Sequence, residues 1–76
     1  MAVERVIEIS TEFIKLSDLL KFASIVPGGS DAKHLILDGA VFVDGETCLQ
    51  RGRKIYPGMK VNGVYDNEKF CLTVNR

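Results

Sequence analysis

The side chains most suited to binding a ligand are the cations of the segment from Thr47 to Tyr65. This segment contains no Asp or Glu, and it holds Arg51, Arg53, Lys54 and Lys60. Guanidinium and ammonium groups bind phosphate oxygens, and arginine can do so through two parallel hydrogen bonds. Because phosphates repeat along a nucleic acid, such a cluster indicates electrostatic capture of its backbone. A solvated loop without a ligand remains the alternative interpretation.

A second group of candidates surrounds the start of a predicted helix. The segment Gly28-Gly29-Ser30 precedes that helix, where free backbone N–H groups attract anions, and Lys33 and His34 follow within it. The expected contact set for a phosphate-bearing ligand is Ser30, Lys33, His34, Arg51, Arg53 and Lys54, with Lys15 and Lys21 as flanking electrostatic help. The simpler interpretation of the two flanking lysines is that they are solvated charges. The simpler interpretation of His34 is an ordinary surface or half-buried imidazole.

Length and composition limit the possible functions. The 76 residues carry ten basic and ten acidic side chains, and 46% are hydrophobic, which predicts one compact soluble domain over residues 1–76. So short a chain leaves little depth for a catalytic cleft, so we expect function on the surface. No apolar run approaches the roughly 20 residues of a membrane span. The acidic N-terminal segment does not resemble a secretory signal, so the cytoplasm is the expected compartment.

Catalysis and metal binding are not indicated. His34 is the single histidine, and Cys48 and Cys71 lack the spacing of a zinc site, so we expect reduced, partly buried thiols with a redox switch as the alternative. Gly28-Gly29 is not followed by the Gly-Lys-Ser/Thr ending of a nucleotide-binding loop. We therefore expect a non-enzymatic protein with no catalytic residues, metal or cofactor.

Hydrophobic periodicity predicts two short helices after an initial strand. The strand covers Val3 to Ile9. Ser17 is the expected N-cap of a helix that ends near Ser24, and Ser30 is the expected N-cap of a second helix from about Asp31 to Asp38. Gly39 follows at the position where a left-handed residue closes a helix.

The rest of the chain predicts strands joined by turns. Val41 and Val43 point to one face of a strand, and Asp44-Gly45 suits a tight hairpin turn before a return strand from Glu46 to Leu49. An irregular basic loop is expected from Gln50 to Gly58. A second hairpin follows, with strands Lys60 to Tyr65 and Lys69 to Val74 around Asp66-Asn67-Glu68. The expected fold class is α+β, with two short helices packed on a small, mostly antiparallel sheet of four to five strands.

Three segments of the sequence resemble the S4-type RNA-binding domain, also called the αL motif. They are KLSDLLKFASIV from Lys15, GGSDAKHLILDGAVFVDGE from Gly28 and QRGRKIYPGMKV from Gln50. The positions that match the family pattern are Ser30, Ala32, Leu35, Ile36, Gly39, Val41, Val43, Gly45 and Pro57-Gly58. The resemblance covers about residues 15–64 and is greatest to the small single-domain bacterial branch.

The resemblance implies binding to structured RNA. Ribosomal RNA is the expected partner, with transfer RNA as another, and a ribosomal particle, ribosome assembly or translation is the expected context; neither DNA nor a membrane is implied. Contact by His34 is favoured on this basis. Asp31 stands where many relatives carry arginine, so a phosphate contact is lost and repulsion is added. Asp44 and Met59-Lys60 also depart from the pattern, and the Asp44 change is conformationally mild.

Two apolar residues do not fit the expected core. The helix and strand periods turn Leu37 and Phe42 away from it. A terminal strand could cover them, or they could form a protein contact. A protein-interaction adaptor or small dimer that uses this apolar patch is therefore the alternative function.

Overall fold

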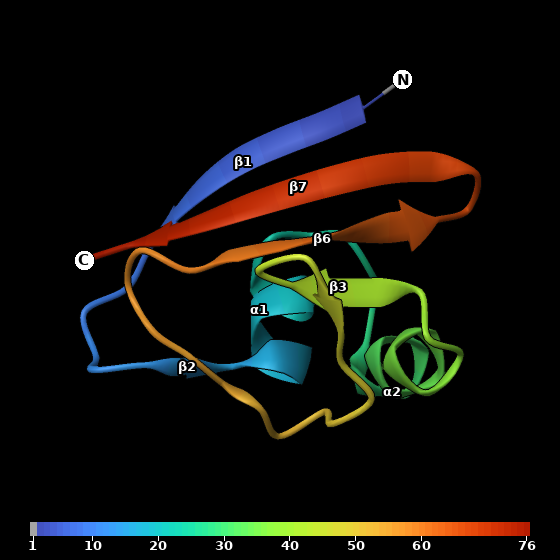
Figure 1. The fold of residues 1–76 in the computed structure, drawn as a ribbon, viewed down its shortest axis with the longest axis horizontal. Helices are drawn as coiled ribbons and strands as arrows, with labels where there is room; N and C mark the ends of the chain where they lie inside the picture. Colours follow the sequence, from blue (N-terminus) through green and yellow to red (C-terminus); the bar gives the residue numbers. More distant parts are fainter. Residues whose placement is uncertain (1) are drawn as a thin grey trace.

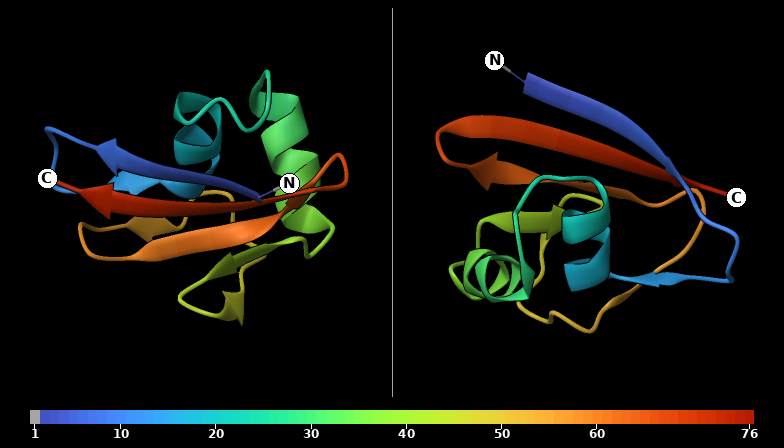
Figure 2. Two further views of the ribbon diagram at one scale, coloured as in Figure 1. Left: turned by 90° about the horizontal axis from the view of Figure 1, so that it is seen from above. Right: turned by 180° about the vertical axis from the view of Figure 1, so that it is seen from behind.

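A computed structural model describes residues 2–76 as two helices and two sheets of short strands (Figure 1). In chain order the elements are β1 (Ala2–Glu8), β2 (Ile14–Lys15), α1 (Leu16–Phe22), α2 (Gly29–Leu37), β3 (Val41–Val43), β4 (Glu46–Thr47), β5 (Lys54–Ile55), β6 (Lys60–Tyr65) and β7 (Glu68–Asn75). Both helices lie on the same side of the larger sheet (Figure 2). No helix within residues 2–76 is long and apolar enough to span a membrane.

The larger sheet has five strands in the order β1-β7-β6-β3-β4. Its neighbours pair antiparallel except for β1 and β7, which run parallel with Val3 opposite Phe70 and Ile7 opposite Val74. The expected α+β class with a mostly antiparallel sheet is therefore confirmed. A separate antiparallel pair joins β2 to β5. The prediction that Gln50 to Gly58 is irregular throughout is wrong at Lys54 and Ile55, because these two residues pair with Lys15 and Ile14.

The core lies between the helices and the larger sheet. Each element contributes residues at its own period, so every third or fourth residue of a helix and every second residue of a strand faces inward. The helices bury Leu16, Leu19, Leu20, Ala32, Leu35 and Ile36, and the strands bury Val41, Val43, Val61, Phe70, Leu72 and Val74. No polar or charged side chain of the described residues is buried in this core.

The helix starts differ from their prediction. α1 begins at Leu16 after the N-cap Lys15, and α2 begins at Gly29 after the N-cap Gly28, so Ser17 and Ser30 are not caps. The amides of Leu16 and Ser17 donate instead to the backbone carbonyls of Arg53 and Arg51, at 2.9 and 3.1 Å. A neighbouring segment of chain thus satisfies the helix donors that a side chain was expected to satisfy.

The helix ends share one geometry. Gly39 has the expected left-handed conformation, with a φ of 77°, and its amide donates to Ile36. Ser24 takes the same place after α1 with a φ of 59°, and its amide donates to Lys21. The following amides, of Ala40 and Ile25, donate to carbonyls five residues earlier in the chain, which completes a Schellman motif at each helix end.

The expected tight turns are present. Asp44 and Gly45 both have positive φ, at 50° and 88°, which suits a primed hairpin turn. The Asp44 carboxylate also accepts a hydrogen bond from the Lys60 amide at 3.0 Å. The second turn is shorter than predicted, because Asp66 and Asn67 alone form it and β7 begins at Glu68.

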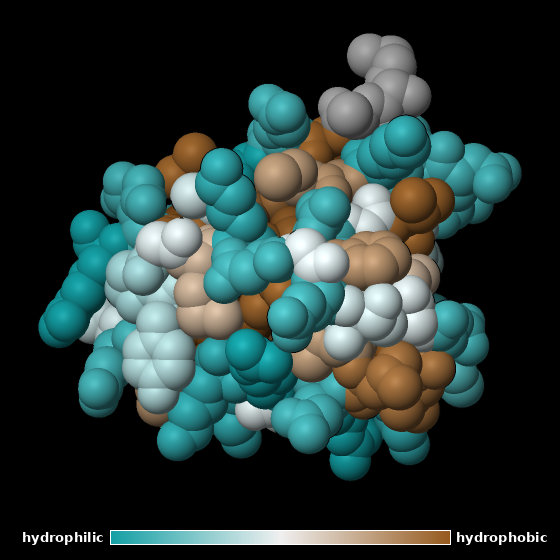
Figure 3. Space-filling model, in the orientation of Figure 1, coloured by the Kyte–Doolittle hydropathy of each residue, from teal (hydrophilic) through white to brown (hydrophobic). Residues whose placement is uncertain are grey.

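Leu37 and Phe42 lie outside the core. Leu37 is 54% exposed, so the expectation that a terminal strand covers it is wrong. Phe42 is half-buried and lines a hollow on the sheet. Strands β1 and β7 belong to the same sheet as Phe42 and therefore do not form a layer over it. Apolar surface also gathers over α2 in Figure 3, between hydrophilic side chains.

Candidate functional site

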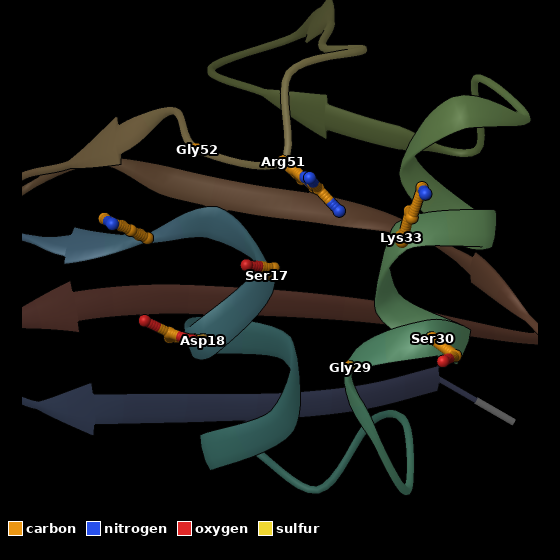
Figure 4. A pocket seen from close by; sticks show the side chains of 8 residues that line it. Ser17, Asp18, Gly29, Ser30, Lys33, Arg51 and Gly52 are labelled. Carbon is orange, nitrogen blue, oxygen red and sulfur yellow. The ribbon is translucent and has the colours of Figure 1, made fainter.

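An open groove of about 500 Å³ lies between the starts of the two helices and the loop before β5. We call it the basic groove, and Figure 4 shows its lining. The lining residues are Lys15, Ser17, Asp18, Gly29, Ser30, Lys33, Arg51 and Gly52. Three segments that are far apart in the sequence therefore meet at this surface.

Backbone hydrogen bonds fix the loop that carries Arg51. The carbonyls of Arg51 and Arg53 accept from the first two amides of α1, and the Arg53 amide donates to the Gln50 carbonyl at 3.1 Å. The last bond closes a tight turn with Arg51 and Gly52 at its centre. Because the turn is bonded to α1, the Arg51 side chain extends toward the part of α2 that carries Lys33 (Figure 4).

The start of α2 supplies a second kind of anion-binding group. Its first intrahelical bond runs from the Ala32 amide to the Gly28 carbonyl at 3.1 Å. The amides of Gly29, Ser30 and Asp31 precede that bond and have no partner within the helix. Gly29 and Ser30 line the basic groove. Their N–H groups and the positive end of the helix dipole favour an anion there.

Positive charge dominates the basic groove. Lys15, Lys33 and Arg51 line it, and Asp18 is the one acid among its lining residues. The Asp18 carboxylate forms an ion pair with the Lys21 ammonium at 3.3 Å, and in Figure 4 it points away from Lys33. Asp31 was expected to repel RNA here, but it does not line the groove. The lining therefore carries net positive charge although the whole chain is neutral.

The predicted contact residues fall into two groups. Ser30, Lys33, Arg51 and Lys15 meet in the basic groove, so Lys15 lines the same groove as the others instead of flanking it. His34, Arg53, Lys54 and Lys21 are exposed and do not line it. Lys21 lies at the edge of the groove, close to Gly29. A Cβ atom added to Gly29 would be 3.9 Å from the ammonium nitrogen of Lys21.

Sequence reasoning missed part of the lining. Ser17 was assigned a capping role, and Asp18 was not singled out, although its place in the first turn of α1 is typical of an acid. Gly52 had a usable signal, since glycine is a common turn residue.

Lys54 belongs to a neighbouring cluster with two aromatic rings. Its ammonium nitrogen lies 4.9 Å from the centre of the Phe13 ring, and the Phe13 and Tyr56 ring centres are 5.7 Å apart. This cluster was not predicted. The sequence carries no recognisable signal for it, because Phe13 and Tyr56 lie just outside the two-residue strands β2 and β5.

The remaining chemistry of the described residues is sparse. Residues 2–76 contain no group of three or more His, Cys, Asp and Glu side chains that could hold a metal ion. Cys48 is buried and Cys71 is half-buried, and neither forms a disulfide. The Cys48 thiol donates a weak hydrogen bond of 3.6 Å to the Gln50 carbonyl, beside the turn that presents Arg51.

Comparison with known proteins identifies a family and a relative. A family model described as the S4 domain matches residues 7–71, a span that includes the whole lining of the basic groove. The "Probable ribosome maturation protein RlbA" of Bacillus subtilis (strain 168) is 40% identical to this chain over 52 residues, which are 68% of this chain and 73% of that protein.

Proposed function

This chain belongs to the S4 domain family, and from that premise we propose that it binds structured RNA in the basic groove without catalysing a reaction. One observation carries the proposal. Lys15, Lys33 and Arg51 come from three separate segments and line one groove beside the free amides that begin α2. Phosphate oxygens satisfy both the cations and the amides.

The binding mechanism is phosphate capture on a shaped surface. Lys15 and Lys33 release counterions from the RNA, and Arg51 clamps one phosphate through two hydrogen bonds. The Gly29 and Ser30 amides donate to a second phosphate. Such contacts set the position and orientation of the RNA but do not read its bases. Selectivity for structured RNA then comes from the fit of backbone shape to the groove.

Residues around the groove extend the interface in this proposal. His34, Arg53 and Lys54 contact the RNA at the edges, and Lys21 strengthens the local field. We interpret α1, α2 and the β3 hairpin as an αL motif. In this interpretation, residues 15–64 form the RNA-binding core of one domain that covers residues 1–76.

Ribosomal RNA is the proposed ligand class. The support is the printed name of the relative from Bacillus subtilis, a probable ribosome maturation protein. A role in ribosome assembly or translation, in the cytoplasm and on a ribosomal particle, follows from that ligand. Transfer RNA is the other structured RNA to be compared with it.

Crosslinking in cells followed by sequencing of the bound RNA tests this proposal. The natural chain should recover ribosomal RNA, and the triple variant Lys15→Ala/Lys33→Ala/Arg51→Ala should lose that recovery. The matched control is Arg5→Ala/Lys60→Ala/Lys69→Ala, which removes three exposed cations from the sheet and should keep the natural pattern. Equal crosslinking by the triple variant and the natural chain would reject the basic groove as the RNA site.

A second candidate function is a protein contact through Leu37 and Phe42. The observation in its favour is the 54% exposure of Leu37 on α2. Leu37→Asp should then abolish a dimer or a partner contact and leave RNA affinity unchanged. Sedimentation of the natural chain and the variant measures the first effect, and an unchanged monomer in both would remove self-association from consideration.

A further inference from the structure

One face of the β2–β5 ribbon combines aromatic and basic side chains. The register pairs Ile14 with Ile55 and Lys15 with Lys54. Ile55 is fully buried, so the ribbon turns its isoleucine face inward. Side chains alternate along a strand, and Lys15 and Lys54 therefore project from the opposite face. Phe13 and Tyr56, each two residues from one of these lysines, complete what we call the ribbon face: Phe13, Lys15, Lys54 and Tyr56.

The ring of Tyr56 is the accessible member of the aromatic pair. The planes of Phe13 and Tyr56 are tilted by 48° with their centres 5.7 Å apart. Lys54 covers Phe13, with its ammonium nitrogen 4.9 Å from the ring centre, and Phe13 is half-buried. Tyr56 is 41% exposed, and its hydroxyl has no hydrogen-bond partner within residues 2–76. A flat apolar surface thus faces solvent beside two cations.

The ribbon face is continuous with the basic groove. Lys15 belongs to both, because it lines the groove and pairs with Lys54 across the ribbon. An RNA strand whose phosphates pass Arg51 and Lys15 therefore reaches Lys54 and Tyr56 next. This arrangement of alternating rings and cations suits a single strand, where phosphates meet cations and bases stack on aromatic faces.

We propose that the base of an unpaired nucleotide stacks on Tyr56 where the bound RNA leaves the basic groove. The proposal rests on the proposed function, and it adds recognition of a single-stranded flank to recognition of structured RNA. Lys15 and Lys54 hold the phosphates on either side of the stacked base. Phe13 packs against the Tyr56 ring in a tilted arrangement and is a positioning residue.

Intrinsic fluorescence can report on this stacking directly. The chain has two tyrosines, Tyr56 and Tyr65, and no tryptophan, so Tyr65→Phe leaves Tyr56 as the one tyrosine emitter. The probes are an RNA hairpin with a short single-stranded adenosine flank and the same hairpin with a blunt end. At saturation the flanked hairpin should quench the emission of Tyr56, and the blunt hairpin should not.

Affinity gives an independent measure. The flanked hairpin should bind the natural chain about tenfold more tightly than the blunt hairpin, which is the usual size of one base–aromatic stack. Tyr56→Phe should keep this advantage, and Tyr56→Leu should lose it. Leucine retains apolar packing against Phe13, so this variant separates stacking from support of the fold, and thermal denaturation checks that it folds.

Each remaining outcome rejects the stacking proposal. Equal quenching by the two hairpins, or an unchanged flank advantage in Tyr56→Leu, would show that the aromatic pair only supports the ribbon. Quenching by a poly-glutamate peptide but not by the flanked RNA would assign the ribbon face to a protein partner. If both hairpins bind equally and both need Lys33 and Arg51, stacking fails while the basic groove stands. If neither hairpin binds, both proposals fail.

Discussion

The basic groove and the open side of the five-stranded sheet are two exposed surfaces built in different ways. The groove gathers three cations and one acid from three distant segments. The sheet has a hollow of about 360 Å³ lined by Glu4, Phe42, Asn62, Gly63, Val64, Lys69, Phe70 and Cys71. That lining mixes one acid, one cation and several apolar side chains. A chain of zero net charge thus separates its charges by folding, so its overall charge is a poor guide to its ligand.

An added methyl group should destabilise the fold strongly at the sheet and hardly at all at the groove, and this is the largest effect we expect. A Cβ on Gly63 would overlap the Ala40 carbonyl oxygen and lie 2.9 Å from an atom of the Phe70 ring. Gly63→Ala should therefore lower the free energy of unfolding by about 2 kcal/mol or more. The Cβ of Gly29→Ala would meet no atom closer than the Lys21 ammonium nitrogen at 3.9 Å. This substitution should change the free energy of unfolding by less than about 0.5 kcal/mol. Urea denaturation followed by circular dichroism measures both, and similar losses would contradict the comparison.

The links that follow the two helices allow a finer test. Ser24 and Gly39 occupy equivalent left-handed positions, which cost a non-glycine residue about 1 kcal/mol. Gly39→Ala should therefore destabilise the fold by about 1 kcal/mol, and Ser24→Gly should stabilise it by roughly half that amount. Thermal unfolding of the two variants measures the sign of each stability change. Ser24→Gly should leave RNA affinity unchanged if the groove is already formed in the free protein, and a change of tenfold or more would show that it is not.

The smallest effect concerns the acid of the groove. Asp18→Asn removes an exposed ion pair with Lys21, which contributes little to stability, so the unfolding free energy should fall by no more than about 0.5 kcal/mol. Affinity for RNA should rise about twofold, because the groove then carries no negative side chain. Fluorescence anisotropy with a labelled hairpin measures the change. A loss of affinity would instead indicate that Asp18 orients Lys21 for contact.

Local patterns predicted most of the fold. Period-two alternation placed β6 and β7, helical spacing placed α1 and α2, and residues suited to positive φ marked the turns at Asp44 and Asp66. The N-caps predicted at Ser17 and Ser30 were wrong. At α1 the reason is that its first donors bind carbonyls of residues 51 and 53, a contact that local sequence does not encode. The β2–β5 pair was missed for the same reason, since two residues per strand carry no recognisable period.

The charged lining of the basic groove was predicted by residue type but not by arrangement. Basic character identified Arg51 and Lys33, whereas the membership of Lys15 depends on the β2–β5 register that places it opposite Lys54. Arg53 and Lys54 lie in the same basic segment as Arg51 but do not line the groove. Arg51 lies at the centre of a turn, Arg53 closes that turn and Lys54 belongs to β5, so the local backbone directs the three side chains differently, which a count of charges cannot reveal.

The salt dependence of RNA binding tests the central claim most directly. Lys33→Ala/Arg51→Ala and Lys60→Ala/Lys69→Ala each remove two exposed cations, the first pair from the groove and the second from the sheet. If RNA phosphates bind in the groove, the first variant should bind a structured ribosomal RNA fragment more weakly. Its slope of log affinity against log salt should also be shallower by about 1.5. The second variant should keep the natural slope. Equal slopes for the two variants would contradict the assignment of the basic groove as the RNA-binding surface.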